Sequence, residues 1–446
     1  MEKPTSKKQA VIIIHGIGNQ YPMETAKEFV ENIKEDSDIL YSSPDREANY
    51  FETRRLSLSQ KKTDFYEFYW ANLISEPKLS ELYFWVLKLL FCKKPSSRVQ
   101  LLVWSIRILT LSLLFTFVYI VFIDIQNFET EGYLTFTHSG IFALVSFVLL
   151  KFIVPIINSK AAQTVGDAVK YLTPSPQNIE SRYKIRKKGI QLLKKLHEKT
   201  DEDGQPLYQR IIIVGHSLGS VVAYDLITNL WHEYMYEYHP DEFPAAQPIL
   251  EEMTALINQS HQQKEQIFPI EQFRELQKKL FKEIKKLKNP WLISDFISIG
   301  SPLCHGDYIL TKNFEEFDKK TNYREYPLCP PKIEVKKEKN AIVKDYDNAI
   351  SFSANLVLNN KGIREKKPMR FINHNSQFSF IQWTNIYFQN DFVGGELNEF
   401  FGKGIQNVPL KANGNWFKRN LPFFSHTNYW SKSQQHSIDE ILKQIF

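Results

Sequence analysis

The residues from Arg210 to Leu226 read RIIIVGHSLGSVVAYDL, a stretch that indicates a strand, a sharp turn and a helix. Ile211 to Val214 are apolar and β-branched, which suits a parallel strand buried on both faces. After the turn, apolar residues recur at helical spacing: Val221, Val222 and Leu226. Ser217 lies between Gly215 and Gly219, which lack the Cβ atoms that would clash with the strand and helix beside them. The pattern therefore predicts a serine at the apex of a strained turn; the alternative is an ordinary Gly-Ser turn.

Composition argues against nucleic-acid binding and a metal site, but it does not select a function. The 446 residues suffice for two or three domains, or for one large domain with insertions. Basic and acidic residues number 56 and 50, so the net charge of +6 gives no case for nucleic acid as a partner. The three cysteines form no C-x-x-C pair, and with the scattered histidines they predict no metal site.

Two apolar runs interrupt the pattern of a soluble protein. The first is LLVWSIRILTLSLLFTFVYIVFI at about 101–123, and the second extends over about 134–157; each is long enough to cross a bilayer. We expect a transmembrane hairpin inserted at about 77–160, rather than two buried helices. The shorter run Leu79 to Phe91 fits an interfacial helix and an ordinary packing helix equally well.

The flanks of the hairpin predict its orientation. Basic residues precede the first run and follow the second, whereas the connection between them is acidic: Lys93, Lys94 and Arg98, then Lys151 and Lys160. By the positive-inside tendency both ends face the cytoplasm. The expectation is an integral membrane protein whose residues before and after the hairpin lie in the cytoplasm.

Outside this insertion, strand and helix patterns alternate. Expected strands are Ala10–Ile14, Phe65–Trp70, Ile211–Val214, Asp295–Leu303 and Phe378–Phe388, with helices at 23–33, 161–172, 183–199 and 437–446. This order predicts an α/β fold with a doubly wound, mostly parallel sheet. Residues 1–76 and 161–446 then form one domain, the latter carrying a helical insert at about 233–290.

Five short motifs carry a resemblance to a known family: HGIG, GHSLGS, SIGSPL, QNDFVGG and SHTNYW. With them the chain resembles the α/β-hydrolase superfamily of serine esterases and lipases, and looks like its bacterial membrane-anchored members. Together with the expected hairpin, this resemblance implies a protein of a bacterial inner membrane with its catalytic domain in the cytoplasm. The likeness covers most of the chain outside the hairpin. It implies a nucleophile elbow at Ser217 and a sheet without the leading strands of larger members.

The resemblance also implies an oxyanion hole, a pair of backbone N–H groups that bind the negative oxygen formed during acyl transfer. In members whose first strand ends in His-Gly, one donor comes from the loop that follows. Here it would be Ile17 or Gly16, and the second donor would be Leu218, directly after the nucleophile.

A catalytic acid and a base follow the nucleophile in the family order. Asp391 in QNDFVGG comes just past an expected strand, and Asp307 is the weaker candidate. His426 precedes the last helix and is the expected base; His374 precedes the acid, and His436 is too close to that helix. His216 is expected to be structural, with its side chain directed the other way along the elbow.

This set predicts ester hydrolysis through an acyl enzyme on Ser217, with no cofactor. Because an anchored enzyme meets lipid at high local concentration, a lipid or phospholipid acyl ester is the expected substrate and the bilayer the expected partner. Alternatives are an anchored esterase or thioesterase for a soluble substrate, and a scaffold or toxin-like protein without activity. Within the insert, 271–288 is expected to be a docked helix, a lid, or a surface that lies on anionic lipid. Residues 332–348, beyond the insert, are expected to be an exposed excursion.

Overall fold

The computed structural model of the chain describes most of the residues outside the apolar insertion. These are residues 8–18, 20–47, 50–74, 170–172, 175–176, 178–237, 247–262, 267–287, 289–331, 334–338, 341–345, 350–360, 363–415 and 425–446, with eight positions between 104 and 122.

The central element is an eight-stranded sheet in the order β12-β11-β6-β5-β1-β4-β3-β2. Its strands are β1 (Lys8–Ile14), β2 (Leu40–Pro44), β3 (Arg54–Leu58), β4 (Thr63–Phe68), β5 (Tyr208–His216), β6 (Ile293–Ile299), β11 (Gln382–Phe388) and β12 (Gln406–Leu410). The strands from β12 to β4 run parallel, and at the other edge β3 pairs antiparallel with both β4 and β2. The fold is therefore α/β with a mixed, mostly parallel sheet.

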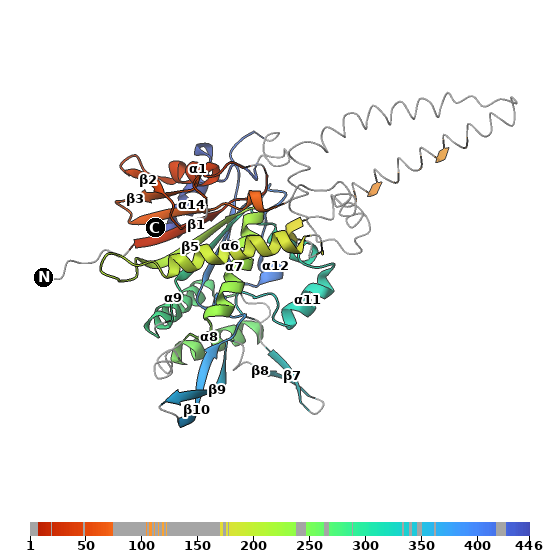
Figure 1. The fold of residues 1–446 in the computed structure, drawn as a ribbon. Coiled ribbons are helices and arrows are strands. Elements are labelled where there is room, and N and C mark those ends of the chain that lie inside the picture. The colour runs from red at the N-terminus through yellow and green to blue at the C-terminus, as the bar shows by residue number, and fades with distance from the viewer. Residues whose placement is uncertain are drawn as a thin grey trace.

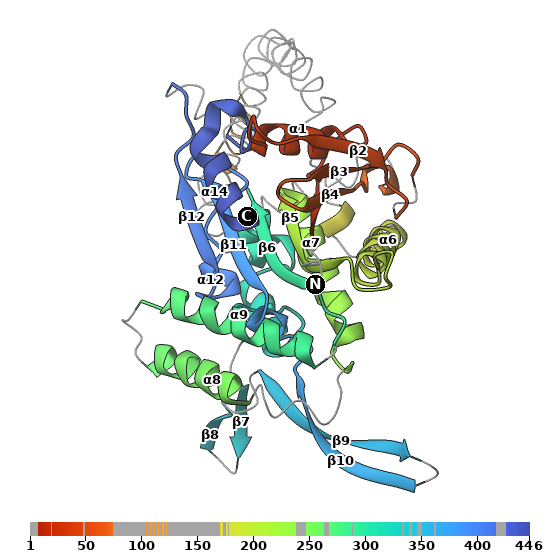
Figure 2. The ribbon, with the colours of Figure 1, turned by 90° about the vertical axis from the view of Figure 1, so that its left-hand side faces the viewer.

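Helices cover both faces of this sheet (Figures 1 and 2). They are α1 (Glu24–Ile33), α6 (Ile179–His197), α7 (Leu218–Tyr234), α8 (Gln247–Gln262), α9 (Ile270–Lys286), α10 (Gly306–Ile309), α11 (Phe314–Asn322), α12 (Asn398–Phe401) and α14 (Gln435–Ile445). Helices α6, α7, α8 and α9 share one hydrophobic core with the sheet, whereas α1 and α14 share the other.

The alternation of side chains along each strand explains the two cores. In β1, Ile12 and Ile14 point into the α6–α9 core, while Val11 and Ile13 point into the α1–α14 core. All four side chains are at most 1% exposed. A strand covered on both faces needs apolar residues at every position, which is why such strands read as continuous apolar runs.

The predicted insert at about 233–290 contains α8 and α9. Helix α9 buries Phe273, Leu276, Leu280 and Ile284, and this apolar face packs into the α6–α9 core. It is therefore docked in the described structure. The predicted excursion at 332–348 contains the antiparallel pair β7 (Glu334–Glu338) and β8 (Ala341–Asp345), and β9 (Ser351–Asn360) pairs with β10 (Ile363–Ile372) beyond it. Both pairs project away from the sheet in Figures 1 and 2.

The membrane prediction needs a correction. Of the helices in the described ranges, none is long and apolar enough to cross a membrane. The predicted integral membrane protein of the bacterial inner membrane is wrong on this finding; it rested on the hydropathy of two runs. The spans at about 101–123 and 134–157 and the run Leu79–Phe91 lie outside the described residues, except for eight helical positions from Trp104 to Phe122.

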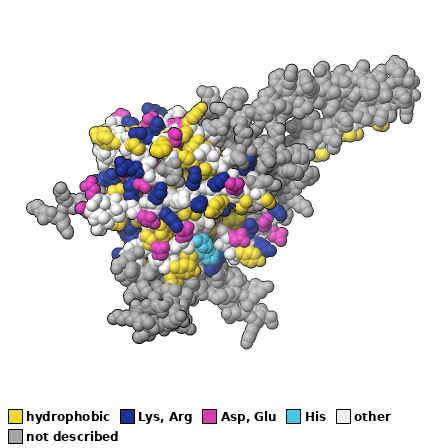
Figure 3. Space-filling model, viewed as in Figure 1, with side chains coloured by type: hydrophobic (Ala, Val, Ile, Leu, Met, Phe, Trp, Pro, Cys, Tyr) yellow, Lys and Arg dark blue, Asp and Glu magenta, His cyan; other side chains and the backbone are white. Residues whose placement is uncertain are grey.

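Surface charge is mixed. Lysine, arginine and acidic side chains are interspersed on the face of the described residues that Figure 3 shows. Many of them form exposed pairs on single helices, such as Lys184 with Glu180 and Lys278 with Glu275. Pairs of this kind contribute little to stability.

Candidate active site

Ser217 lies at the sharp junction between β5 and α7. Its backbone has a positive φ of 52° with ψ of −130°. A non-glycine residue held in such a region costs on the order of 1–3 kcal/mol, so the surrounding structure has to enforce it. Here the Ser217 N–H donates to the carbonyl of Ile299 on β6 at 2.9 Å, and the Ser217 carbonyl accepts from the Ser220 N–H at 3.0 Å. The strained turn stands where the sequence predicts it.

The two glycines of the turn permit close backbone packing. A Cβ at Gly215 would lie 2.6 Å from the Cα of Ser220. A Cβ at Gly219 would lie 2.2 Å from the carbonyl oxygen of Ile14, at the end of β1. Both distances are far below van der Waals contact, and both neighbours are backbone atoms. Glycine is therefore required at these positions for the observed packing.

Asp391 and His426 form a buried pair, although 35 residues separate them. Asp391 follows β11, where its N–H donates to the carbonyl of Phe388 at 2.9 Å. The Nδ1 atom of His426 lies 2.9 Å from Oδ2 of Asp391. Tyr429 donates its hydroxyl to the same oxygen at 2.7 Å, and the Val393 N–H donates to Oδ1 at 2.8 Å. Three donors thus hold one carboxylate in a single orientation.

These donors also set the charge of the carboxylate. Burial alone would raise the pKa of Asp391, but the charge of His426 and the hydrogen bonds from His426, Tyr429 and Val393 lower it, and the net shift is downward. Burial next to Asp391 raises the pKa of Tyr429 well above its usual value. Asp391 is therefore an ionised acceptor and Tyr429 a neutral donor. This arrangement favours the tautomer of His426 that carries its proton on Nδ1 and leaves Nε2 free to accept one.

His216 contacts His426 directly. Its Nε2 lies 2.9 Å from the carbonyl oxygen of His426, so Nε2 carries the proton and donates. The two imidazole rings stack with centroids 5.1 Å apart. Burial, assisted by the charge of His426, lowers the pKa of His216 to about 3, so the ring is neutral. The expected structural role is compatible with this contact, but the side chain is not directed away from the predicted base.

The loop after β1 lies against Ser217. A Cβ added at Gly16 would lie 2.9 Å from the Cβ of Ser217. Ile17, the next residue, is partly buried against the α6–α9 core. Leu218 is the first residue of α7, where backbone N–H groups have no partner within the helix. The structure therefore brings the regions of all three predicted oxyanion donors, Gly16, Ile17 and Leu218, to the serine.

One contact of the predicted triad is not formed. The hydroxyl of Ser217 has no hydrogen-bond partner among the described residues, whereas the His426 backbone is held beside Ser217 through His216. Catalytic hydrogen bonds are often long or poorly aligned without substrate. A side-chain movement that closes the Ser217–His426 contact is the step that catalysis would still require.

The weaker candidates lie elsewhere. Asp307 is on α10, where burial and then the charge of Glu399 raise its pKa to about 6. His374 lies beside His232, with ring centroids 5.0 Å apart. His436 is on α14, and its ring centroid is 6.0 Å from that of Phe388. No contact between Asp391 and any of these side chains is among the described interactions.

Sequence reasoning missed Tyr429 and two glycines at the acid. A Cβ at Gly300 would lie 3.0 Å from Oδ2 of Asp391 and 3.2 Å from Cε1 of His426, and one at Gly394 would lie 2.8 Å from the same Oδ2. These residues stand in the motifs SIGSPL, QNDFVGG and SHTNYW. The two glycines in these motifs were the available signal, because a backbone that lies close to a carboxylate leaves no room for a Cβ atom.

Two open cavities are lined by other residues. One of about 640 Å³ is lined by residues near β12 and the start of α9, among them Phe268, Glu399 and Asn407. Another of about 320 Å³ lies between β5, β6 and α9 and is lined by Arg210, Lys278, Lys282 and Lys285. None of the predicted catalytic residues lines either cavity. Within the described ranges, no group of three or more histidine, cysteine or acidic side chains could hold a metal ion.

Comparison with known proteins identifies no relative. No family model matches the chain, and no match is found among curated proteins or among solved structures. The case for a function therefore rests on the arrangement of Ser217, Asp391 and His426.

Proposed function

We propose that this chain is a serine hydrolase that cleaves carboxylic esters through an acyl enzyme on Ser217, on a fold of the α/β-hydrolase type. The observation that carries the proposal is the buried Asp391–His426 pair, which a hydrogen bond links to His216, the residue before a serine with a strained backbone at the end of a central parallel strand. The order serine, acid, histidine along the chain agrees with that fold.

In the proposed reaction, Nε2 of His426 takes the hydroxyl proton of Ser217 as the serine oxygen attacks the ester carbonyl. Asp391 keeps Nδ1 protonated and stabilises the imidazolium that results. The protonated His426 then gives its proton to the leaving alcohol, which leaves an acyl group on Ser217. Water, deprotonated by His426, then attacks that acyl group; the bond to Ser217 breaks, His426 returns the proton to the serine oxygen, and the carboxylic acid leaves.

The negative oxygen of each tetrahedral intermediate needs fixed donors. We assign this role to the N–H groups of Ile17 and Leu218, with Gly16 as the alternative on the loop. Removing one such donor typically lowers the rate about 100- to 1000-fold. The reaction as written needs no cofactor.

The proposed substrates are carboxylic esters as a class. The expectation of a lipid ester depended on the bilayer hairpin, and the described helices do not support that hairpin. A protein with this fold but without activity remains the competing hypothesis, and it predicts an unreactive Ser217.

The test is turnover of a small activated ester such as a p-nitrophenyl ester. Ser217→Ala and His426→Ala should each remove nearly all turnover, and the wild type should release p-nitrophenol in a burst if deacylation is slow. His374→Ala is the matched control, since His374 lies near His232 and not near Asp391. Equal activity of wild type and Ser217→Ala would reject the proposal.

A further inference from the structure

His15 directly follows β1, and its ring forms a hydrogen bond with the carbonyl of Gly16, the first residue of the loop that carries the proposed oxyanion donor. Its Nδ1 lies 2.7 Å from the carbonyl oxygen of Gly16, and its Nε2 lies 3.1 Å from the backbone nitrogen of Trp70. The His15 side chain is fully enclosed, with 1% of the residue exposed. Such a buried polar ring is expected to use both nitrogens, as this one does.

The partners define the protonation state of the ring. The backbone N–H of Trp70 can only donate, so Nε2 of His15 must be the acceptor without a proton. The carbonyl of Gly16 can only accept, so Nδ1 carries the proton. Burial lowers the pKa of His15 to about 4, which keeps the ring neutral near pH 7. The imidazole therefore donates to Gly16 in one fixed tautomer.

This hydrogen bond orients a peptide plane. In a trans peptide the carbonyl of one residue and the N–H of the next point to opposite sides. The only cis bond in the described chain is Cys329–Pro330, so the Gly16–Ile17 peptide is trans. With the Gly16 carbonyl directed at His15, the Ile17 N–H points away from the imidazole. Gly16 itself lies against Ser217.

We propose that His15 is a positioning residue that fixes the Gly16–Ile17 peptide, so that the N–H of Ile17 serves as an oxyanion donor. The inference rests on the proposed function and deepens it, because it chooses Ile17 over Gly16 as the donor on this loop. His15 acts through the peptide and does not touch the reacting atoms.

Trp70 holds His15 in place. In addition to the backbone contact, the indole Nε1 of Trp70 donates to the carbonyl of His15 at 3.0 Å. The two rings are parallel within 1°, with centroids 5.2 Å apart. The strands that precede these residues are paired in the sheet, where Ile14 lies opposite Phe68. The ring of His15 is therefore anchored to the segment that directly follows β4.

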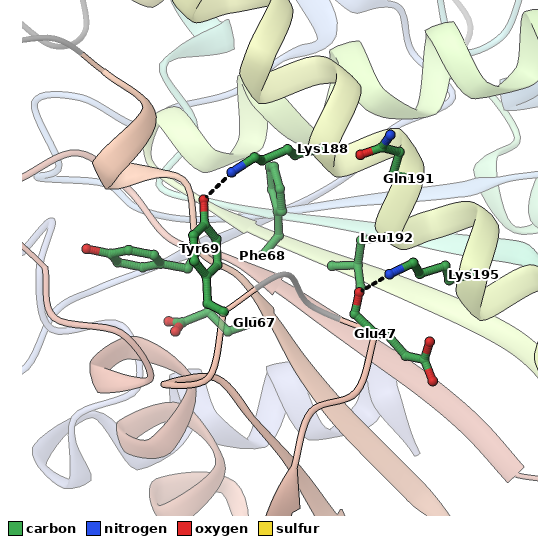
Figure 4. A pocket seen from close by; sticks show the side chains of 9 residues that line it. Glu47, Glu67, Phe68, Tyr69, Lys188, Gln191, Leu192 and Lys195 are labelled. Atoms are coloured by element: carbon green, nitrogen blue, oxygen red, sulfur yellow. Dashed lines mark hydrogen bonds between the residues drawn. The ribbon is translucent and has the colours of Figure 1, made fainter.

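The residues around Trp70 hold the far end of the same loop. Tyr69 donates its hydroxyl to the carbonyl of Gln20 at 3.0 Å, and the Met23 N–H donates to the buried carboxyl of Glu67. Figure 4 shows Glu67 and Tyr69 beside a small cavity, with Lys188 and Lys195 of α6 across it. The cavity holds about 20 Å³, space for about one water molecule, so it is too small for a substrate. The end of β4 thus supports the loop at both ends.

The test compares an ester with the matching thionoester, in which sulfur replaces the carbonyl oxygen. Sulfur accepts hydrogen bonds weakly, so a lost oxyanion donor should affect the thionoester less. We expect His15→Leu to lower kcat/KM for the ester about 100- to 1000-fold with KM little changed, and to lower it much less for the thionoester. Equal losses on both substrates would mean that His15 only supports folding.

Two further variants sharpen the comparison. In His15→Asn the amide nitrogen is two bonds from Cβ, as Nδ1 is in histidine, so it can still donate to the Gly16 carbonyl. It should recover much of the ester rate, and no recovery would count against the peptide-orienting role. His197→Leu is the control, because His197 is also buried and bonds a backbone carbonyl at 2.7 Å, but on α6. It should leave the ester-to-thionoester ratio unchanged.

A second measurement does not depend on activity. In ¹⁵N-histidine NMR spectra of the wild type, His15 should appear as the neutral Nδ1–H tautomer and stay so down to about pH 5. An Nε2–H tautomer, or titration near pH 6.5, would overturn the inference. If the wild type does not react with a fluorophosphonate, the proposed function fails by itself; if it reacts but the tautomer is wrong, only the role of His15 fails.

Discussion

Gly219→Ala places a methyl group where the elbow helix meets the first strand, and the structure predicts a severe effect. The new Cβ would lie 2.2 Å from the Ile14 carbonyl oxygen, 2.5 Å from that of His15 and 2.8 Å from the Ile14 carbonyl carbon. All three are backbone atoms, so no change of rotamer can relieve the contact. The start of α7 has to move by at least about 0.8 Å to restore a separation of 3.0 Å.

The size of the effect follows from two opposing contributions. Alanine favours a helix over glycine by about 1 kcal/mol. Overpacking of a tightly packed site costs about 1–3 kcal/mol and occasionally more, and contact with rigid backbone belongs at the upper end. We therefore expect Gly219→Ala to lose about 2 kcal/mol of unfolding free energy. The shift also moves Ser217 and Leu218 relative to the loop after β1 that carries the proposed oxyanion donor, so reaction with a fluorophosphonate should slow at least about 10-fold.

The assay is urea unfolding followed by tryptophan fluorescence, with fluorophosphonate labelling rates measured on the folded variants. Gly204→Ala is the matched control: Gly204 has a φ of +73°, but a Cβ there meets nothing within 4 Å. It should cost only about 1 kcal/mol, the penalty of a left-handed residue, and leave labelling unchanged. The reasoning is refuted if Gly219→Ala is as stable and as reactive as the wild type.

Three further results are expected. The double variant Ser217→Ala/His426→Ala should be little worse than either single variant in ester turnover, because residues that act as a unit are not additive; additive losses would place the two residues in separate roles. Tyr429→Phe removes a 2.7 Å hydrogen bond to the ionised Asp391, so urea unfolding at pH 7 should show a loss of about 2 kcal/mol, and no loss would contradict the assigned ionisation. Burial lowers the pKa of His197 from 6.5 to about 4, so between these pH values the unfolded chain binds more protons than the folded chain. As pH falls through this window, the free energy of unfolding of the wild type should therefore decrease by about 3 kcal/mol because of this ring. His197→Leu should lack this part of the pH dependence, and parallel unfolding curves for the two proteins between pH 7 and pH 4 would rule it out.

The central strands were predictable because burial on both faces leaves a clear apolar run. The runs at Ala10–Ile14 and Ile211–Val214 correspond to β1 and β5. The predicted strand Phe378–Phe388 was less accurate, because a 3-10 turn occupies Gln377–Ser379 and β11 begins only at Gln382. Apolar periodicity alone does not separate the turn from the strand.

The edge strands were missed for a different reason. β2 reads LYSSP and β12 reads QNVPL, and each contains a proline and polar residues that a central strand would not tolerate. Edge strands are only partly covered, so their sequences carry little apolar signal. They are identified by their pairing with a neighbour, which sequence periodicity does not report.

In the candidate site, too, residues with a local sequence signal were predictable and residues that act through long-range contacts were not. Ser217 has a local signature, and Asp391 and His426 stand at predictable places after a strand and before the last helix. The roles of Tyr429 and His15 depend on contacts between segments 38 and 55 residues apart in the chain. Such contacts follow from the strand order of the sheet, so the sequence offered no direct route to them.

The most direct test of the proposed function is intact-mass analysis after treatment with a fluorophosphonate. Only an activated serine reacts with such a probe, because the hydroxyl must be deprotonated as it attacks phosphorus. We predict that the wild type gains the mass of one phosphonyl group, located on Ser217 by peptide mapping, and that Ser217→Ala gains none. A wild type that remains unlabelled while folded, or one labelled at another serine, would contradict the assignment of Ser217, Asp391 and His426 as a catalytic unit.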